Sequence, residues 1–534
     1  MSTPISTLRI CTGVPLNNSY EHTLYFETPE DQLAYFNSKM VRNFTNFSFL
    51  RPENAIKVMG DFAEAYSWNY LMFNNGGKMF YHFINSVEYV NDNTVLLHIE
   101  LDVMQTFQFD WELHNCLIER THTKTDNFGE HTIPEGLETG PLVQASSYEV
   151  DLNDCAIMIL APGSAFGGQM YGGVYSGLNV YAVAPAMVSK LNAWFQKDAL
   201  NAESIVAMWM YPKDLLIIDG DWNAEPYPDF PLHYVKNART VNVNNIADPF
   251  YNKATLNGVP VRNMKTFCYP NTIVYASNHM GGSAIYHREW FNTPGKFSFK
   301  LYGAVSPDGG VTMAPVGYKS DNDIFTPNYE ETISLPAFPS CAWASDTYKV
   351  WLAQNMATQT EAIRQAHTSG ALSLIGGIAG VVGGAFTGSV TTMAGGATLA
   401  LNGLNSSSNT IRSIMAQRED MKVQPDQGRG QHSASVNMTS GKMGFSLHFM
   451  CITPEYIQTI DDYFTRFGYQ VNTFAYPSIR NREAFTYIKT AGAFVTGNLG
   501  TDNQRKIQAI FDNGITFWVN PDDVGQYGIS NDPI

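Results

Sequence analysis

The feature that most constrains this chain is a long stretch without charged side chains. Residues 365–411 contain no Asp, Glu, Lys or Arg, and the nearest charges on either side are Arg364 and Arg412. A helix rises about 1.5 Å per residue, so some 20 helical residues cross a bilayer core of about 30 Å. The uncharged stretch is therefore long enough to enter a membrane.

Small residues recur at every fourth position within this stretch. On a helix, this spacing forms one ribbon along which another backbone can approach closely, as helices do when they pack in lipid. Each interior glycine costs about 0.5–1 kcal/mol relative to alanine in water, so we expect such a helix to be mobile until it is buried. The positions are Gly376, Gly380, Gly384, Gly388, Thr392, Gly396 and Ala400.

We interpret residues 351–425 as a long hydrophobic loop with helical tendency and a membrane-active centre. The centre is Gly-rich and only moderately apolar, which suits a segment held in an assembly and released later. A flexible Gly-rich linker is the alternative interpretation, because Gly-rich tracts are common spacers. The side chains assigned to the membrane-active centre are Leu374, Ile375, Gly376, Ile378, Gly380, Val381, Val382, Gly384, Phe386, Gly388, Val390, Met393, Gly396, Leu399 and Leu401.

The charge balance excludes a protein that grips nucleic acid. The net charge is -16, and only 15% of the residues are charged, whereas phosphate binding needs clustered Lys and Arg. An acidic or neutral wall would still let DNA slide past, because it makes no attractive phosphate contacts. The composition therefore allows a conduit for DNA but not a DNA-binding module.

The cysteines and the start of the chain indicate the compartment of folding. The first ten residues lack the basic and apolar regions of a signal peptide, which predicts synthesis and folding in a cytoplasm. No C-x-x-C pair occurs, so we expect reduced and buried thiols. The six cysteines are Cys11, Cys116, Cys155, Cys268, Cys341 and Cys451.

Local patterns predict a mainly β fold with some α-helix. Residues 78–90, 94–101 and 442–451 are rich in β-branched and aromatic side chains and are expected to be strands. Pro29 and Pro454 stand where a first helical turn tolerates proline, each next to acidic residues. For the first helix we expect Leu33, Tyr35 and Phe36 on the buried face, and for the second we expect an end at Gly468.

Patterns for nucleotide or metal binding are incomplete. Residues 383–389 have the glycine spacing of a phosphate-binding loop, but Ser389 replaces the required lysine. Four potential metal ligands have no standard zinc spacing. The segment 119–126, which contains one of them, is expected to form a solvated loop. These ligands are His114, His122, Glu130 and His131, and we predict neither a metal nor another cofactor.

Catalysis finds no support in the sequence either. Asp219 with Asp221, and Asp461 with Asp462, could form the carboxylate pair of a glycosidase. Such pairs occur by chance in an acidic chain, however, and Asp-Gly-Asp is more often a turn. No nucleophile elbow or zinc-protease helix is present. We therefore predict that the chain is not an enzyme.

Several segments, taken in order, resemble the distal tail-tube (tail knob) proteins of small short-tailed phages, the picovirus-like podophages. The resemblance covers about the first 140 and the last 100 residues, and the uncharged stretch occupies the place of the family's long hydrophobic loop. No single motif is specific, but their order is. The matching segments are residues 35–39, 99–110, 119–122 and 135–137 near the start, and 467–472, 485–490 and 510–518 near the end.

We expect a division of the chain into four parts. The resemblance implies that residues 1–148 and 426–534 form a β-rich tube domain together. Residues 149–350 lie outside the resemblance, and their many Gly, Pro and Asn residues predict a loop-rich inserted domain, expected at the distal knob. The remaining residues, 351–425, correspond to the hydrophobic loop.

The resemblance also implies a function in the virion. The expected protein is a homohexameric tube at the distal end of the tail, whose loops plug the lumen and then enter the host membrane as a channel for DNA. Its implied partners are a proximal tail or collar protein, phage DNA that passes without tight binding, the host membrane and a wall-degrading protein at the tip. A receptor-binding or baseplate-like tail protein with a flexible linker is the alternative.

Overall fold

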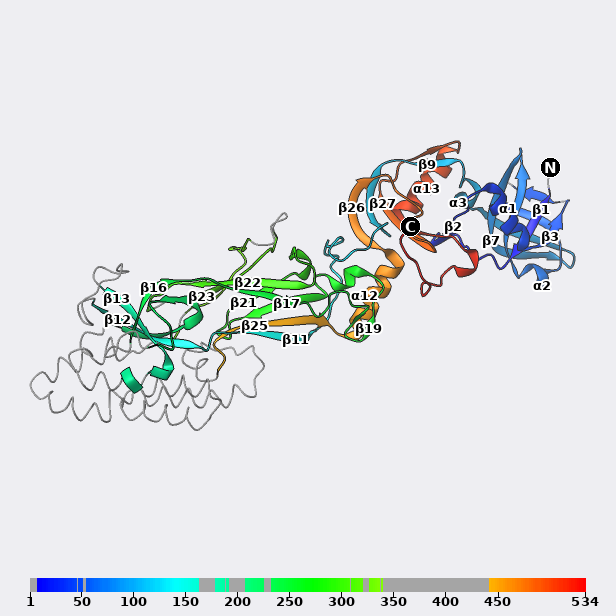
Figure 1. Ribbon diagram of the computed structural model, residues 1–534. Helices are drawn as coiled ribbons and strands as arrows, with labels where there is room; N and C mark the ends of the chain where they lie inside the picture. Colours follow the sequence, from blue (N-terminus) through cyan, green and yellow to red (C-terminus); the bar gives the residue numbers. More distant parts are fainter. Residues whose placement is uncertain are drawn as a thin grey trace, which may run out of the picture. The chain divides into compact units, whose positions relative to one another are not determined.

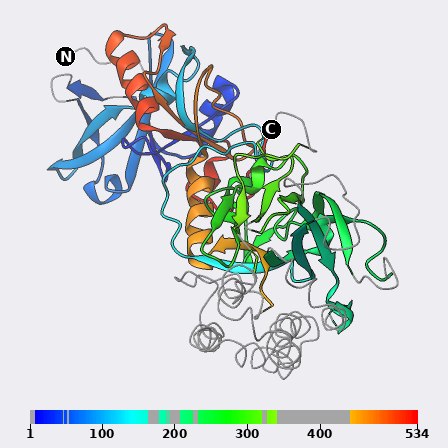
Figure 2. The same cartoon turned by 90° about the vertical axis from the view of Figure 1, so that its left-hand side faces the viewer.

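The computed structural model describes most of the chain in two compact units. The first unit comprises Met1–Thr139, Gly258–Phe267 and Pro454–Ile534, and the second comprises Gly140–Asn257 and Cys268–Thr453. Figures 1 and 2 show the helices and strands of each. The described residues are 7–45, 47–50, 54–162, 178–187, 189–191, 207–224, 232–307, 309–319, 326–336, 338–339 and 441–534.

The first unit contains an antiparallel seven-stranded sheet built from the N-terminal part of the chain. Strands β7 and β8 form its longest hairpin, and strands β3 and β4 are its two edges. In spatial order the strands are β3 (Met40–Phe44), β1 (Leu8–Thr12), β6 (Trp68–Asn75), β7 (Lys78–Asn91), β8 (Thr94–Leu101), β5 (Ala55–Met59) and β4 (Ser48–Leu50).

A second sheet of the same unit combines both ends of the chain. Strands β2 and β29 pair in parallel, and the other pairs are antiparallel. β9 (Trp111–Leu113) and β28 (Val495–Gly497) form a separate two-stranded ribbon. The short strand β19 (Val259–Pro260) also belongs to this unit. The order of the second sheet is β2 (His22–Leu24), β29 (Ile515–Trp518), β27 (Phe485–Ala491), β10 (Cys116–Thr121) and β26 (Tyr469–Ala475).

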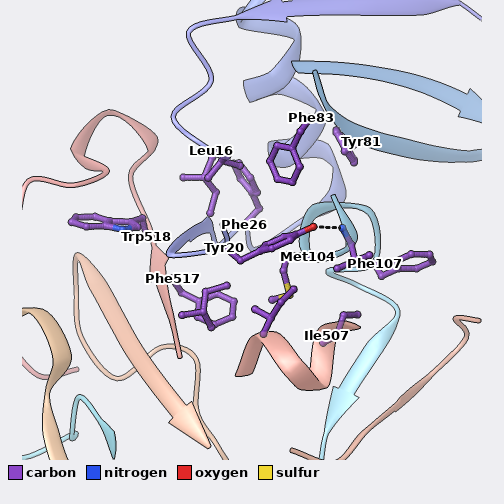
Figure 3. Close-up of a cluster of buried hydrophobic side chains, with 14 of the residues drawn as sticks. Leu16, Tyr20, Phe26, Tyr81, Phe83, Met104, Phe107, Ile507, Phe517 and Trp518 are labelled. Carbon is purple, nitrogen blue, oxygen red and sulfur yellow. Dashed lines mark hydrogen bonds between the residues drawn. The ribbon is translucent and has the colours of Figure 1, made fainter. Parts of the chain in front are cut away.

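One core joins the N-terminal and C-terminal parts of the first unit. Side chains from both parts are packed together in Figure 3, among them Tyr81, Phe83, Ile507 and Trp518. The Tyr20 hydroxyl accepts a hydrogen bond from the backbone N–H of Val103 at 3.2 Å within this core. Burial of large aromatic side chains is a dominant stabilising term, so the two ends of the chain fold together.

Two of the helices described in the first unit, those expected at Pro29 and Pro454, begin where local signals predict. The helices are α1 (Pro29–Ser38), α2 (Phe62–Ala65), α3 (Val103–Thr106), α12 (Pro454–Phe467) and α13 (Thr501–Asn513). Thr28 caps α1 by accepting the backbone N–H of Asp31 at 3.1 Å. The buried side chains of α1 are Gln32 and Phe36. Leu33 and Tyr35, expected on the same apolar face as Phe36, are half-buried and pack against the core.

Gly468 ends α12 in a conformation and a space that only glycine fits. Its φ is +63°, and a Cβ atom there would overlap the carbonyl group of Thr121. Gly492 has a similar φ of +69° but has nothing within 4 Å of its Cβ position. Substitution of Gly492 therefore tests backbone strain alone, whereas substitution of Gly468 tests backbone strain and steric conflict together.

Replacing Gly468 with alanine is expected to lower the free energy of unfolding by about 3 kcal/mol, because strain and conflict add. Gly492→Ala is the matched control, and it should cost only about 1 kcal/mol from backbone strain. Urea unfolding of both variants measures the difference. Equal losses would show that the Thr121 backbone moves aside without cost.

The second unit is also mainly β, which confirms the expected fold class for the described residues. Its first sheet is β11 (Leu142–Asp151), β25 (Gly444–Ile452), β20 (Thr272–Ser277) and β21 (Ser283–Tyr286). A five-stranded sheet has the order β14 (Ala207–Pro212), β12 (Cys155–Pro162), β13 (Leu178–Val183), β16 (His233–Ala238) and β15 (Leu216–Ile218). A further sheet has the order β17 (Val241–Ala247), β22 (Lys296–Gly303), β23 (Val311–Pro315) and β24 (Ile333–Leu335).

The compact units differ in their bounds from the expected division at residues 148 and 426. The first unit ends at Thr139 and resumes at Pro454. The reason is that β11 and β25 pair along their whole length inside the second unit. A short return, Gly258–Phe267, also belongs to the first unit. The roles expected for these parts, tube and distal knob, remain proposals.

Candidate functional site

The predicted membrane-active centre lies outside the described residues. This holds for all fifteen of its side chains, from Leu374 to Leu401, and for the whole expected loop, residues 351–425. Among the residues that the structure describes, no helix is long and apolar enough to cross a membrane. The functional surfaces that can be built from contacts are therefore those of the first unit.

The four potential metal ligands have separate, structural contacts. His114 Nε2 lies 2.7 Å from the Thr496 hydroxyl, and His131 Nε2 lies 3.0 Å from the Thr125 carbonyl oxygen. Glu130 accepts hydrogen bonds from the Asn127 backbone and side chain. Within the described ranges, no three His, Cys, Asp or Glu side chains gather as metal ligands would. The five described cysteines are buried, as expected, and no disulfide joins them.

The solvated loop expected over residues 119–126 was wrong in part, because residues 119–121 belong to β10 and His122 is buried, whereas Lys124 and Thr125 are exposed. The backbone N–H of Tyr487 donates to His122 Nδ1 at 2.8 Å, and Nε2 donates to the Thr465 carbonyl oxygen at 3.0 Å. Burial, with a smaller effect of the nearby Arg482 charge, lowers the pKa of His122 to about 3. The neutral imidazole thus links β27 and α12 to the end of β10.

The buried His122 predicts a loss of stability in mild acid. An unfolded histidine takes up a proton below pH 6.5, whereas folded His122 does so only near its pKa of about 3. The stabilisation is complete above pH 6.5 and is lost as the pH falls, by about 2 kcal/mol between pH 7 and pH 5. His122→Gln should be less stable at pH 7 but should lose about 2 kcal/mol less over this interval in urea titrations. An unchanged pH dependence would contradict the assignment.

The carboxylate pair Asp461 and Asp462 has a structural role in the first unit. Asp461 is 3% exposed, and its Oδ1 accepts the backbone N–H of Asn263 at 3.0 Å. Arg262 pairs with Asp462 at 2.7 Å. These contacts hold the returning segment Gly258–Phe267 on α12. The Asp461 carboxylate is therefore occupied by hydrogen bonds to this segment, as buried polar groups usually are.

Glu135 fixes the same returning segment from another side. Its carboxylate is almost fully buried and pairs with both Arg120 and Lys265. The backbone N–H of Gln470, on β26, donates to Glu135 Oε1 at 3.0 Å. A buried carboxylate is stable when several charged donors surround it. The network makes β10 and β26 a rigid support for the surface beside them.

A groove of about 760 Å³ lies beside β26, the edge strand of the second sheet. Trp111 and Tyr476 provide its aromatic walls. The other lining residues are Gln108, Glu112, Leu113, Ile118, Thr121, Thr123, Lys124, Val471, Thr473, Pro477, Ser478, Ile479, Arg480 and Asn481. We call it the β26 groove. Strand β26 contains no charged residue, and its Phe474 is 71% exposed. Edge strands are usually protected by charges, so this strand is suited to being covered by another protein surface.

Some residues that line the β26 groove have buried polar atoms without a hydrogen-bond partner among the described residues. Trp111 Nε1, Arg480 Nε, Gln108 Oε1 and Asn481 Oδ1 are buried and, within the described structure, have no hydrogen-bond partner. Asn481 as a whole is only 6% exposed. An unsatisfied buried polar group costs about 1–3 kcal/mol.

An apolar surface is exposed beside α2, where strands β5 and β7 of the seven-stranded sheet end. It consists of Met59, Phe62, Tyr66 and Tyr89, and we call it the α2 patch. Tyr66 is 80% exposed, Met59 69% and Tyr89 54%, while the ring of Phe62 lies 6.5 Å from that of Tyr66 and 6.1 Å from that of Tyr89. Exposed apolar clusters of this kind are typical of protein–protein contacts.

Sequence patterns pointed to neither surface. The groove combines three distant segments, and the patch combines the end of β5, α2 and the end of β7. The only local signal was an uncharged edge strand that runs into Phe474 and Tyr476.

Two family models match the chain. Residues 234–532 match the model described as Bacillus phage phi29, Tail knob protein gp9, C-terminal domain. Residues 4–112 match the model described as Caudoviral major tail protein N-terminus. The second match covers the seven-stranded sheet and the α2 patch.

Similar proteins extend over the whole chain. It is 25% identical to the tail knob protein gp9 of Bacillus phage B103, with 98% of each chain covered. It is 23% identical to the tail knob protein gp9 of Bacillus phage phi29, with 99% of this chain and 98% of that protein covered. The solved structure of the bacteriophage C1 tail knob protein, gp12, shares the fold with a TM-score of 0.62 at 13% identity, covering 99% and 100% of the two chains.

The fold and these matches define a structural component of a short phage tail. More specifically, the chain belongs to the phi29 gp9 tail knob family, whose C-terminal domain model covers more than half of it. The family expected from the order of short sequence segments is thereby confirmed.

Proposed function

We propose that six copies of this tail knob protein form the distal tube of a short tail, through which the genome leaves the virion. The chain carries a net charge of -16, so six copies carry six times -16, or -96. A wall of this sign repels phosphate and lets DNA slide. The β-rich first unit supplies a rigid element for such a wall.

We further propose that the hydrophobic loop, residues 351–425, plugs the lumen before infection. On ejection the loops enter the host membrane and line a channel for DNA. The uncharged residues 365–411, with small residues at every fourth position, support this step, because close helix packing in lipid uses that spacing. Arg364 and Arg412 would then lie at the headgroups on either side.

The proposal includes the place of the protein in the virion. The protein is made and assembled in the host cytoplasm and lies at the distal end of the tail. It contacts a proximal tail or collar protein on one side and a wall-degrading protein at the tip. It performs no catalysis of its own.

The observation that carries the proposal is the full-length similarity to tail knob proteins in a chain that also holds a long uncharged segment. Light scattering and negative-stain imaging of the purified protein test it. A six-fold ring with about six times the mass of 59.4 kDa is expected. A monomer or trimer would contradict the tube and favour a receptor-binding tail protein with a flexible linker.

A further inference from the structure

We propose that the α2 patch of one copy docks into the β26 groove of the next copy, and that this contact builds the ring. The inference rests on the proposed function, because it names the contact by which the proposed tube assembles. The occupant of the groove is thus a second copy of this chain.

The two surfaces complement each other in shape. The β26 groove is concave, with a volume of about 760 Å³ and aromatic walls. The α2 patch consists of exposed side chains, of which Tyr66 is 80% exposed. Insertion of aromatic side chains into a groove is a common form of interface hot spot. Tyr66 and Tyr89 supply such side chains, while Trp111 and Tyr476 supply walls that receive them.

The charges on the two surfaces also correspond. Lys124 and Glu112 line the β26 groove, and among the described contacts neither has an ion-pair partner. Asp61 precedes α2, and Lys57 lies on the same strand as Met59. Neither of these has a described ion-pair partner. On docking, the Asp61 carboxylate can pair with Lys124, and the Lys57 ammonium group can pair with Glu112. This pairing places no two charges of the same sign together.

The positions of the two surfaces favour a contact between copies over a contact with an unrelated protein. The α2 patch lies at the end of the first sheet, and β26 is the outer strand of the second sheet, on the opposite side of the same unit (Figure 1). A single core makes these sheets one body. Because one chain carries both halves of the contact on opposite sides, copies join head to tail, which generates a ring when the rotation closes.

The unsatisfied polar atoms of the groove give a second, independent reason. Trp111 Nε1 and Arg480 Nε are donors, whereas Asn481 Oδ1 and Gln108 Oε1 are acceptors. A protein segment presents both N–H and C=O groups, so it can satisfy both kinds after small side-chain rotations. A purely apolar or purely anionic ligand would satisfy at most one kind.

Cysteine cross-linking of the full chain tests the contact directly. In the double variant Tyr66→Cys with Tyr476→Cys, mild oxidation should produce a covalent ladder that ends at the ring size, whereas each single variant should give no ladder. The pair Tyr66→Cys with Ile285→Cys is the matched control, because Ile285 is 50% exposed on the second unit and belongs to neither surface. Absence of the ladder in the test pair, or an equal ladder in the control, would overturn the inference.

Charged substitutions provide a measure of the strength of the contact. Tyr66→Glu and Tyr476→Glu should each weaken assembly by about 100-fold, measured by sedimentation, with an unchanged melting temperature of the dissociated chain. If both variants assemble as tightly as the wild type, the docking of these two surfaces is wrong, but the proposed tube is not contradicted. If the wild type itself forms no closed ring, the proposed function fails, and this inference fails with it. If the thiol of the Tyr476→Cys variant cross-links to an unrelated protein but not to a second copy, the assigned occupant is wrong.

Discussion

Replacing Arg288 with methionine is expected to lower the free energy of unfolding of the second unit by about 3–5 kcal/mol, because it leaves a buried carboxylate without its cation. The Arg288 side chain is 0% exposed and that of Asp248 is 3% exposed. Arg288 Nη2 lies 2.6 Å from Asp248 Oδ2, and Nε lies 3.1 Å from the same carboxylate. Arg288 Nη1 also donates to the Thr272 hydroxyl at 2.9 Å, so the pair links β20 to the loop after β17.

The measurement is amide hydrogen exchange, which reports on each unit separately. Exchange should accelerate in β20 and β22 of the second unit, while β6, β7 and β8 of the first unit keep their protection. Arg239→Met is the matched control, since the Arg239 side chain is exposed, its ion pair with Asp214 spans 3.9 Å, and its one close contact with a described residue is a solvent-exposed hydrogen bond from Nε to the Asp214 carbonyl oxygen. We expect the control to cost less than about 0.5 kcal/mol.

A double variant distinguishes a lost interaction from a lost packing volume. Asp248→Asn together with Arg288→Met removes both charges, so the unpaired carboxylate of the single variant no longer exists. The double variant should regain part of the loss seen in Arg288→Met. If the double variant is as unstable as the sum of the two single variants, the ion pair contributes nothing beyond its packing.

Local signals in the sequence predicted the elements that local chemistry determines. Pro29 begins α1, Pro454 begins α12, and Gly468 ends it, because helix ends and turn conformations involve only neighbouring residues. The hairpin of β7 and β8 follows from two β-rich runs separated by a short turn. These elements were predictable within a few residues.

Contacts between distant segments were not predictable in the same way. The His448 imidazole lies 2.8 Å from Gln144 Oε1 across 304 residues of sequence, and this pairing of β25 with β11 moves both strands into the second unit. Asp461 resembled a catalytic or surface carboxylate until its backbone donors at Arg262 and Asn263 were known. A pattern within one segment carries no information about which other segment it will meet.

The candidate surfaces illustrate the same limit. Trp111, Lys124 and Tyr476 meet in one groove because β9, the segment after β10 and the segment after β26 lie together in the fold. The hydrophobic loop is the opposite case, since the prediction of its membrane activity comes from composition and spacing within one segment. Its function can therefore be tested from the sequence without any contact information.

Two aspartates at the centre of the hydrophobic loop are expected to abolish its action on membranes. A charged side chain at the centre of a bilayer costs about 2.5–3.5 kcal/mol, so Val381→Asp with Val382→Asp costs about 5–7 kcal/mol. A change of this size lowers insertion by more than about 1,000-fold. Leakage of dye from liposomes, caused by the full-length protein, should therefore fall to the background level.

The control keeps the segment apolar and changes only its shape. Val381→Leu with Val382→Leu retains hydrophobicity, and it should leave leakage within about twofold of the wild-type value. The aspartate variant should still form the same multimer, because the proposed ring contact lies in the first unit. Leakage that survives both aspartates would mean that residues 374–401 do not enter lipid, and the segment would then act as a Gly-rich linker. Loss of the multimer in the aspartate variant alone would instead assign the segment to assembly.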